Sequence, residues 1–213
     1  MNFDNAYPMS HKKKKKVLIL GVTGNYGSGK TTVARMFHNL GAACIDADKI
    51  YHQLIKRGTA LYRNLVADFG KGILGKYKQI NRKKLSKLAF GSTLNLKKLA
   101  QITHPGIIAK IKSELARLKK MNTTKVIVID APLLIEAGLT NLVNKIIVVM
   151  IKPEKQVMRC IRLKNISRRE ARQRIKNQMP LAKKVKLADF VIDNNGTLKK
   201  TKKQVQGFWQ KIK

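Results

Sequence analysis

Residues 17–31 read VLILGVTGNYGSGKT, and this stretch decides the fold. The apolar run at 17–22 is typical of a buried strand, and the segment at 24–31 matches the G-x-x-x-x-G-K-[ST] pattern of a phosphate loop. In such loops, backbone N–H groups and the N-terminus of the following helix surround phosphate oxygens. We therefore predict a nucleoside triphosphate site rather than a glycine-rich turn without a ligand.

The side chains of the loop have separate expected roles. Lys30 is placed to reach the β- and γ-phosphates, and the Thr31 hydroxyl to hold Mg²⁺. Asn25 belongs to the non-glycine type that best tolerates a left-handed backbone, so it suits a loop position where glycine is common. The residues predicted to bind nucleotide here are Asn25, Tyr26, Gly27, Ser28, Gly29, Lys30, Thr31 and Thr32.

Length and composition limit the alternatives. A chain of 213 residues buries one substantial core, with room for an inserted subdomain. No apolar stretch is long enough to cross a membrane, and residues 1–16 lack the apolar centre of a secretory signal, so a cytoplasmic protein is expected. Cys44 and Cys160 are too few and too far apart to indicate a disulfide framework or a zinc site.

The charge is extreme, because 46 Lys and Arg residues against 11 Asp and Glu residues give a formal net charge of +35. Three interpretations compete: the positive charge attracts nucleic acid, it attracts a small polyanionic substrate, or it belongs to a lysine-rich solvated surface without a binding role. The last interpretation is favoured, since lysines occur in nearly every segment and signatures of nucleic-acid-binding modules are absent. We expect weak, salt-sensitive polyanion binding, no specific nucleic-acid recognition, and a disordered basic arm at 1–16.

Strand patterns alternate with helical patterns along the chain, which indicates an α/β fold. Strands are predicted at 17–22, 42–45, 126–129, 146–151 and 190–192. Residues 49–121 have helical character, and the last helix of this segment is expected to begin near Pro105. Two arginine-rich helices are predicted at 153–179, closed by Pro180, and a terminal helix begins at Thr197.

Carboxylates are scarce, and several lie at the ends of apolar runs or just beyond them, where α/β enzymes place their sites. These are Asp46, Asp48, Asp130, Glu136, Asp189 and Asp193. Asp130 is placed to orient Mg²⁺ beside Thr31, and Asp46 or Asp48 can accept a proton from an attacking hydroxyl. This combination favours a kinase over a simple ATPase, although Asp is also common in turns and at helix N-caps.

Arginines concentrate in the 153–180 segment, where a guanidinium can stabilise charge on a transferred phosphoryl group. They are Arg159, Arg162, Arg168, Arg169, Arg172 and Arg174. We expect one or two of them to touch nucleotide and the others to be solvated.

Several motifs follow one another at characteristic intervals. They are GVTGNYGSGKT at 21–31, IDAD at 45–48, HP at 104–105, DAPLLIE at 130–136, NQMP at 177–180 and LADFVIDNNG at 187–196. With these motifs, the chain from about Lys16 onward resembles the dephospho-CoA kinase family. The resemblance implies phosphorylation of the ribose 3′-hydroxyl of dephospho-CoA by ATP with Mg²⁺, the last step of coenzyme A synthesis. It also implies a phosphate-loop NTPase fold with a five-stranded parallel sheet between helices, a helical substrate-binding insertion and a lid.

The resemblance further implies roles for individual residues. Asp48 resembles the family's catalytic base and Asp46 its companion, with Lys30 and the lid residue Arg159 as the cations. The substrate side comprises Thr23, Asp48, His104, Pro132 and Leu133, and the segment around Asn194 is expected near adenine. His104 is equally compatible with an ordinary histidine at a helix start.

Two positions depart from the family pattern. Tyr26 stands where relatives often carry a small aliphatic residue. Relatives also usually have two lid arginines four residues apart, whereas Leu163 stands four residues after Arg159. Arg162 and Lys164 therefore remain alternatives for the lid contact with phosphate.

We predict a single kinase domain at 17–213 that acts as a monomer or weak homo-oligomer. Its core is expected at 17–48, 122–152 and 181–213, its helical acceptor-binding subdomain at 49–121 and its lid at 153–180. Two alternatives stay open. One is a kinase of the same architecture acting on a nucleoside monophosphate or shikimate, and the other is a nucleic-acid-stimulated ATPase or basic binding protein.

Overall fold

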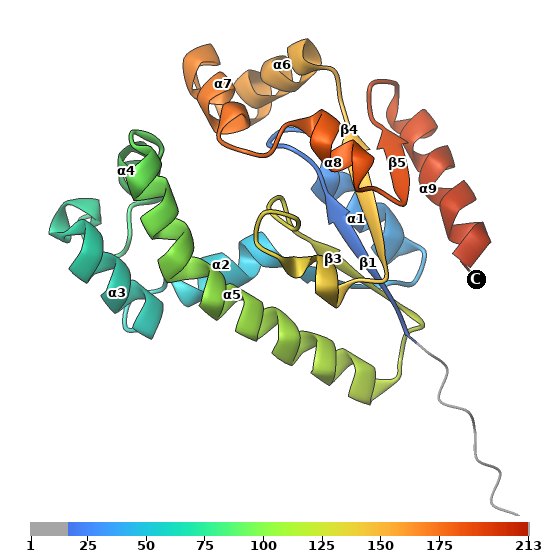
Figure 1. Ribbon diagram of the computed structural model, residues 1–213, viewed down its shortest axis with the longest axis horizontal. Coiled ribbons are helices and arrows are strands. Elements are labelled where there is room, and N and C mark those ends of the chain that lie inside the picture. The colour runs from blue at the N-terminus through green and yellow to red at the C-terminus, as the bar shows by residue number, and fades with distance from the viewer. Residues whose placement is uncertain (1–16, 213) are drawn as a thin grey trace, which may run out of the picture.

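The computed structural model describes residues 17–212, which contain a five-stranded parallel sheet in the order β2-β3-β1-β4-β5 (Figure 1). The strands are β1 (Leu18–Thr23), β2 (Ala43–Asp46), β3 (Val126–Asp130), β4 (Lys145–Met150) and β5 (Phe190–Asp193). The predicted α/β phosphate-loop fold is thus confirmed. The basic arm predicted at 1–16 lies outside the described residues.

Helices cover both faces of the sheet, and others form an insertion or project beyond the strands. In chain order, the helices are α1 (Lys30–Asn39), α2 (Ala47–Leu54), α3 (Ala60–Phe69), α4 (Arg82–Phe90), α5 (Thr93–Met121), α6 (Pro153–Lys164), α7 (Arg168–Lys176), α8 (Leu181–Lys186) and α9 (Leu198–Ile212), with short 3₁₀ turns η1 (Lys71–Ile73) and η2 (Leu139–Leu142). Within residues 17–212, no helix combines the length and apolar character needed to cross a bilayer.

The core forms because the strands are apolar on both faces. All five residues of β3 are buried, as expected for a central strand of a parallel sheet. Successive side chains point to opposite faces, so Val128 packs in the cluster that contains residues of α1 and α9, and Ile129 in the cluster beneath α2 and α5. Phe37 of α1 and Trp209 of α9 fill the first cluster, with ring centroids 6.3 Å apart.

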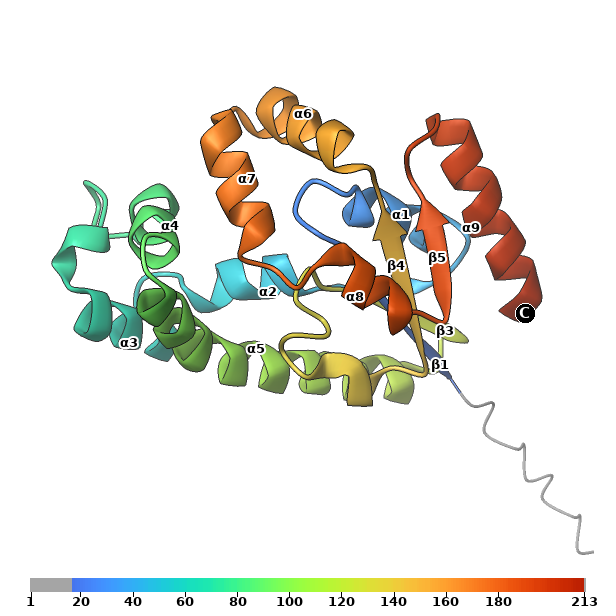
Figure 2. The ribbon, with the colours of Figure 1, turned by 45° about the horizontal axis from the view of Figure 1, so that its top comes forward.

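A helical insertion with its own core separates β2 from β3 (Figure 2). Leu65 of α3, Ile73 of η1 and Leu85 of α4 are at most 2% exposed and pack together. Leu99, in the first half of α5, packs against the same cluster, whereas Ile111, in the second half, packs beneath the sheet. One long helix therefore connects the insertion rigidly to the sheet.

The expectation that the last helix of the insertion begins near Pro105 is wrong. Pro105 lies inside α5, which runs unbroken from Thr93 to Met121. A proline inside a helix removes one backbone hydrogen bond and costs about 3 kcal/mol. The helix continues because its two halves are buried in two different cores, and this burial outweighs the local cost.

Helices α6 and α7 project from the carboxyl end of β4 and lie on the phosphate-loop side of the sheet (Figures 1 and 2). Ser167 caps α7, since its hydroxyl accepts a hydrogen bond from the Glu170 N–H at 3.1 Å. The predicted end is wrong. The helix stops at Lys176, and Pro180 instead precedes α8, a short helix that the sequence pattern did not indicate.

Candidate active site

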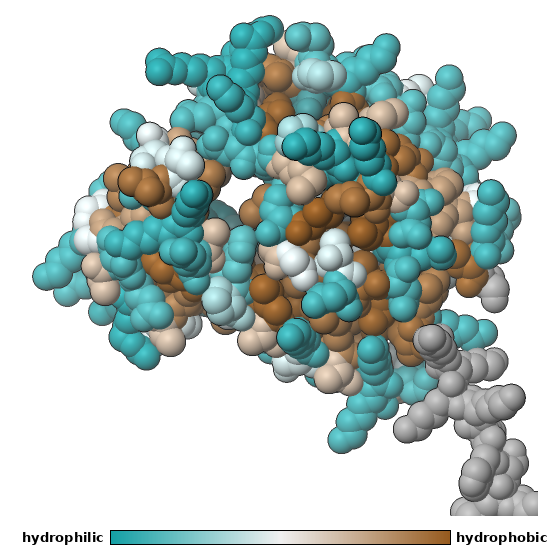
Figure 3. All heavy atoms as spheres, viewed as in Figure 1, coloured by the Kyte–Doolittle hydropathy of each residue, from teal (hydrophilic) through white to brown (hydrophobic). Residues whose placement is uncertain are grey.

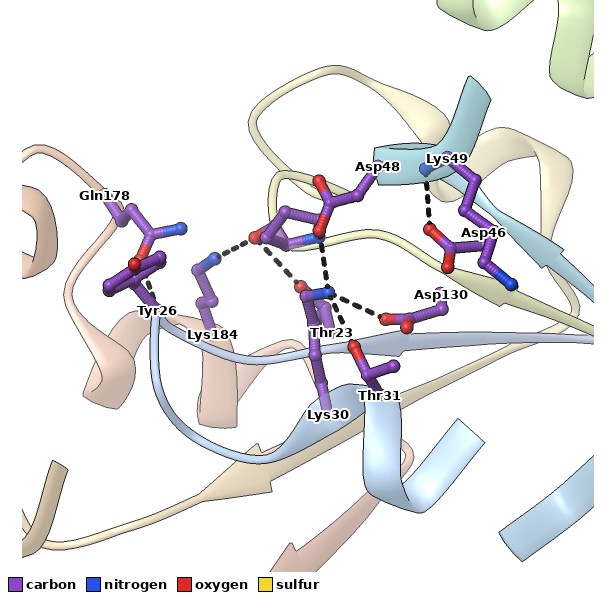
Figure 4. A network of polar contacts seen from close by, with 11 residues as sticks. Thr23, Tyr26, Lys30, Thr31, Asp46, Asp48, Lys49, Asp130, Gln178 and Lys184 are labelled. Atoms are coloured by element: carbon purple, nitrogen blue, oxygen red, sulfur yellow. Dashed lines mark hydrogen bonds and ion pairs between the residues drawn. The ribbon is translucent and has the colours of Figure 1, made fainter. Parts of the chain in front are cut away.

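The candidate site lies where the carboxyl ends of the strands meet (Figure 4). The strand register places Val22 of β1 and Asp46 of β2 on either side of Asp130 in β3. The phosphate loop leaves β1 at this edge, and Asp48 lies in the first turn of α2, directly after β2. The sheet therefore brings together the phosphate loop, the neighbouring Asp46 and Asp48, and the distant Asp130.

Asp189 lies at the opposite end of the sheet, so its predicted place at the site edge is wrong. It precedes β5, and its Oδ2 accepts a hydrogen bond from the Ile146 N–H in β4 at 2.8 Å. An Asp just before a parallel strand belongs to the amino-terminal edge, whichever apolar run it follows. Asp193 does end its strand, and there its Oδ1 accepts the Asn195 N–H at 2.8 Å and shapes the turn.

The phosphate loop takes its shape from Gly27 and Gly29, which have φ values of 83° and 91°. Gly29 is the N-cap of α1, so the loop leads directly into the positive end of a helix. Asn25 does not share this conformation, since it is absent from the positive-φ residues of the described chain. The expectation of a left-handed role for it is wrong, and its buried amide instead donates to the Met179 carbonyl at 3.3 Å.

Asn194 holds the loop from the β5 side. Its Nδ2 donates to the Ser28 carbonyl at 2.7 Å, and its Oδ1 accepts from the Thr201 hydroxyl at 2.9 Å. The side chain is thereby buried against the loop backbone. Asn194 therefore fixes where the loop N–H groups point, and contact between this segment and adenine stays a prediction.

Gly29→Ala should weaken ATP binding by at least about tenfold, because each lost hydrogen bond to a charged phosphate is worth roughly 1.5–3 kcal/mol. An alanine Cβ would collide with the Asn194 amide, and the left-handed φ costs a further 1–3 kcal/mol or so. Isothermal titration with ATP measures the effect. Gly72→Ala is the matched control, since a Cβ there meets open space. Unchanged ATP affinity of Gly29→Ala would contradict the loop assignment.

Lys30 is the centre of the polar network (Figure 4). Its Nζ lies 3.0 Å from Asp130 Oδ1, 3.4 Å from Asp48 Oδ2 and 3.4 Å from the Thr31 hydroxyl. Burial lowers the pKa of Lys30, but Asp130 and Asp48 together outweigh burial and raise it above its ordinary value. The ammonium is therefore charged at neutral pH and available to a phosphate group.

Asp130 is a buried carboxylate whose environment suits a metal ion. Its side chain is 3% exposed, and burial raises its pKa against the opposing charge of Lys30. Within residues 17–212, its Oδ1 meets Lys30 as an ion pair but has no aligned hydrogen bond. Thr31 and Asp130 thus present oxygens that fit Mg²⁺, which commonly takes one or two protein ligands together with water and phosphate. The described residues contain no cluster of three or more His, Cys, Asp or Glu side chains able to hold a metal.

Asp46 and Asp48 differ in their surroundings although they are two residues apart. Asp46 caps α2, because its Oδ1 accepts the Lys49 N–H at 2.9 Å. The side chain of Asp48 is 57% exposed and faces the Lys30 ammonium. Asp48 is therefore an exposed carboxylate facing the phosphate loop, and Asp46 caps the helix that carries it.

The segment after β3 is tied to both β1 and α8. The buried Thr23 hydroxyl donates to the Pro132 carbonyl at 3.2 Å, and Lys184 Nζ donates to the same carbonyl at 2.8 Å. Lys184 is fully buried and pairs with Glu136 at 2.9 Å. Burial lowers its pKa, and the Glu136 charge opposes that change. Sequence reasoning missed Lys184, because nothing distinguishes it from the many solvated lysines of the chain.

His104 lies half-buried in the middle of α5, so its interpretation as a histidine at a helix start is wrong. Burial lowers its pKa, and the Glu136 carboxylate opposes this only in part. The ring is therefore neutral at pH 7. Ile107 and Ile108, about one turn further along α5, pack in the same cluster as Leu134, so this part of the helix lies beside the segment after β3.

His104 should make the protein less stable in acid. Its folded-state pKa lies below 6.5, so the unfolded chain binds the proton more readily, and stability falls as the pH drops below 6.5 towards the folded pKa. Replacing it by His104→Gln should reduce the difference between melting temperatures at pH 8 and pH 5. An unchanged difference in thermal unfolding would show that this histidine does not carry the acid sensitivity.

Two arginines of α6 and α7 contact Tyr26 of the phosphate loop or Asn194, which holds that loop. Arg159 donates to the Asn194 carbonyl at 3.0 Å, and a Cβ at position 29 would lie 3.6 Å from its guanidinium. Arg174 donates to the Tyr26 hydroxyl at 3.2 Å. The remaining lid arginines are exposed, namely Arg162, Arg168, Arg169 and Arg172. This agrees with the expectation that most lid arginines are solvated.

Comparison with known proteins agrees with this geometry. A family model described as dephospho-CoA kinase matches residues 18–200. A dephospho-CoA kinase of Carboxydothermus hydrogenoformans is 43% identical over 92% of this chain and 94% of its own. A dephospho-CoA kinase of Geobacillus kaustophilus is 42% identical over 88% of this chain and 93% of its own. The solved dephospho-CoA kinase of Campylobacter jejuni is 30% identical, with a TM-score of 0.65 over 91% of this chain and 96% of its own. The resemblance seen in the sequence motifs is therefore confirmed, and the chain belongs to the dephospho-CoA kinase family of phosphate-transferring enzymes.

Proposed function

We propose that this protein transfers the γ-phosphoryl group of ATP to the ribose 3′-hydroxyl of dephospho-CoA. The observation that carries the proposal is the position of Lys30, whose ammonium lies between the accessible Asp48 and the buried Asp130 beside the phosphate loop. A phosphate held at Lys30 would thus lie next to a carboxylate open to solvent. Family membership supports dephospho-CoA as the acceptor in place of shikimate or a nucleoside monophosphate.

The residues act in a defined order in this proposal. Backbone N–H groups of the loop and Lys30 bind the β- and γ-phosphates and hold the phosphorus in line with the acceptor hydroxyl. The hydroxyl oxygen forms the new bond to phosphorus, the bond to the β-phosphate oxygen breaks, and Asp48 accepts the hydroxyl proton. Arg159 stabilises charge on the transferred group. Thr31 and Asp130 would hold Mg²⁺, which supplies charge neutralisation at the phosphates.

The acceptor is proposed to bind between the helical insertion and the sheet. Figure 3 shows a hollow between these two parts of the molecule. Two of the residues proposed to bind the acceptor come from helices that join the insertion to the sheet: Asp48 from α2 and His104 from α5. We therefore propose the insertion at 49–121 as the acceptor-binding subdomain and the segment at 153–180 as the lid, with Thr23, Pro132 and Leu133 forming the wall beneath the acceptor.

An acceptor panel tests the proposed function. ATP consumption is followed in a coupled assay with dephospho-CoA, shikimate, AMP or RNA as the added compound. We expect dephospho-CoA to be the only compound of the panel that stimulates ATP consumption. We also expect EDTA to abolish the activity by removing Mg²⁺, and added Mg²⁺ to restore it. Strong stimulation by RNA without turnover of dephospho-CoA would overturn the proposal in favour of a nucleic-acid-stimulated ATPase.

The high positive charge is proposed to give weak polyanion affinity without sequence recognition. Figure 3 shows hydrophilic side chains over much of the visible face rather than in one groove. If about six phosphates were contacted, binding of RNA or DNA would fall by about 10³-fold between 50 and 200 mM salt, with little difference among sequences. Filter binding at several salt concentrations measures this. A salt-resistant, sequence-selective complex would contradict it. A cytoplasmic location and a monomeric or weakly associated state complete the proposal.

A further inference from the structure

Arg174 of the lid lies between two aromatic rings from different parts of the molecule. The centre of its guanidinium is 5.1 Å from the ring centroid of Tyr26 in the phosphate loop and 5.7 Å from that of Phe90 at the end of α4. Both distances are within the range at which a cation is attracted to the face of a ring. One side chain of the lid thus contacts the nucleotide-binding loop and the helical insertion together.

Hydrogen bonds fix the orientation of this guanidinium. Arg174 donates to the Tyr26 hydroxyl at 3.2 Å and to Glu170 Oε1 at 2.8 Å. Its neighbour Gln173 donates to the Phe90 carbonyl at 2.6 Å, which attaches α7 to the backbone of the insertion as well. The Arg174 Nε is buried and has no hydrogen-bond partner within residues 17–212. The contacts of this guanidinium therefore depend on its planar shape, which suits ring faces and directed hydrogen bonds, as well as on its charge.

Tyr26 is held by its backbone as well as by its ring. Its N–H donates to Gln178 Oε1 at 2.6 Å (Figure 4). Its carbonyl accepts a hydrogen bond from Gln156 Nε2 at 2.7 Å. Tyr26 also packs against a buried cluster formed by Val157, Cys160 and Ala171 of α6 and α7. If the loop shifts around bound phosphates, the Tyr26 side chain therefore shifts with it and changes its contact with Arg174.

We propose that Arg174 is a positioning residue that couples nucleotide binding at the phosphate loop to acceptor binding by the helical insertion. The inference rests on the proposed function, because it assigns the acceptor to the insertion. Coupling between two ligand sites commonly changes affinity by about 5- to 150-fold. ATP bound in the loop fixes Tyr26, Tyr26 and Phe90 fix Arg174, and the insertion is thereby held in the arrangement that accepts dephospho-CoA.

Calorimetric titration of dephospho-CoA, with and without a non-hydrolysable ATP analogue, tests the coupling. In the wild type, the analogue should tighten acceptor binding by about 5- to 150-fold. In Arg174→Lys, which keeps the charge but loses the planar fork, that factor should approach one while affinity for the analogue alone stays within about threefold. Arg172→Lys, an exposed arginine on the same helix, is the control and should keep the wild-type factor.

A variant cycle separates positioning from simple stabilisation. The effects of Tyr26→Leu and Phe90→Leu on acceptor affinity with bound analogue should be non-additive when Arg174 is present and additive in the Arg174→Lys background. A lower melting temperature of Arg174→Lys with intact coupling would overturn the proposal, as would absence of coupling in the wild type. A wild type that shows the coupling but transfers no phosphate to dephospho-CoA would overturn the proposed function and leave the coupling standing.

Discussion

Asp48→Asn should bind ATP normally and transfer phosphate about 10²- to 10⁴-fold more slowly than the wild type, the usual cost of losing a positioned general base. The amide keeps the size of the carboxylate but cannot take the proton of the acceptor hydroxyl. Asp48 lies in α2, outside the phosphate loop, and its contact with Lys30 is long, at 3.4 Å. Turnover in the coupled assay and ATP affinity by calorimetry measure the two effects separately.

Asp46→Asn is the matched control for Asp48→Asn. The Asp46 side chain accepts the Lys49 N–H at the start of α2, and asparagine is an equally good residue at a helix N-cap. We therefore expect a mild loss of turnover. If Asp46→Asn were inactive and Asp48→Asn active, the two roles would be reversed. If both were active, neither carboxylate would be the base.

Lys30→Ala should lower turnover by about 10²- to 10³-fold or more, the scale seen when one donor to developing charge is removed. The loop loses its mobile positive charge at the β- and γ-phosphates. The fold should survive, because Asp130, already of raised pKa, can take up a proton once its partner is gone. Steady-state kinetics and circular dichroism check the two parts of this prediction.

A double variant shows whether the loss comes from catalysis or from folding. Combining Lys30→Ala with Asp130→Asn removes both members of the buried ion pair, so no charge is left uncompensated. The melting temperature should recover toward that of the wild type while turnover stays lost. Near-normal turnover of a folded Lys30→Ala protein would contradict the assignment of the phosphate loop.

The sequence predicted the sheet and the loop well because both are local patterns. The apolar run at 126–129 predicts a buried strand, and Asp130 directly follows it, so the position of Asp130 at the carboxyl end of a strand could be predicted. Asp189 was misplaced for the opposite reason. An Asp that follows an apolar run lies at the carboxyl edge only if that run is a strand, and the segment before Asp189 is helix α8 instead.

Features that depend on tertiary packing could not be predicted. Pro105 stays inside α5 only because both halves of that helix are buried in separate cores. Lys184 is buried beside Glu136, and Arg174 lies between Tyr26 and Phe90, yet each looks like one more surface cation in a lysine- and arginine-rich chain. Burial of a cation is decided by its neighbours in space, which the local sequence does not contain.

The most direct measurement is identification of the product formed by the wild-type protein from ATP, Mg²⁺ and dephospho-CoA. Phosphorus NMR of the purified product should show a new phosphomonoester on the ribose 3′-oxygen, with one ADP released for each phosphate transferred. ADP release that does not depend on dephospho-CoA, or phosphate on any other oxygen, would contradict the account.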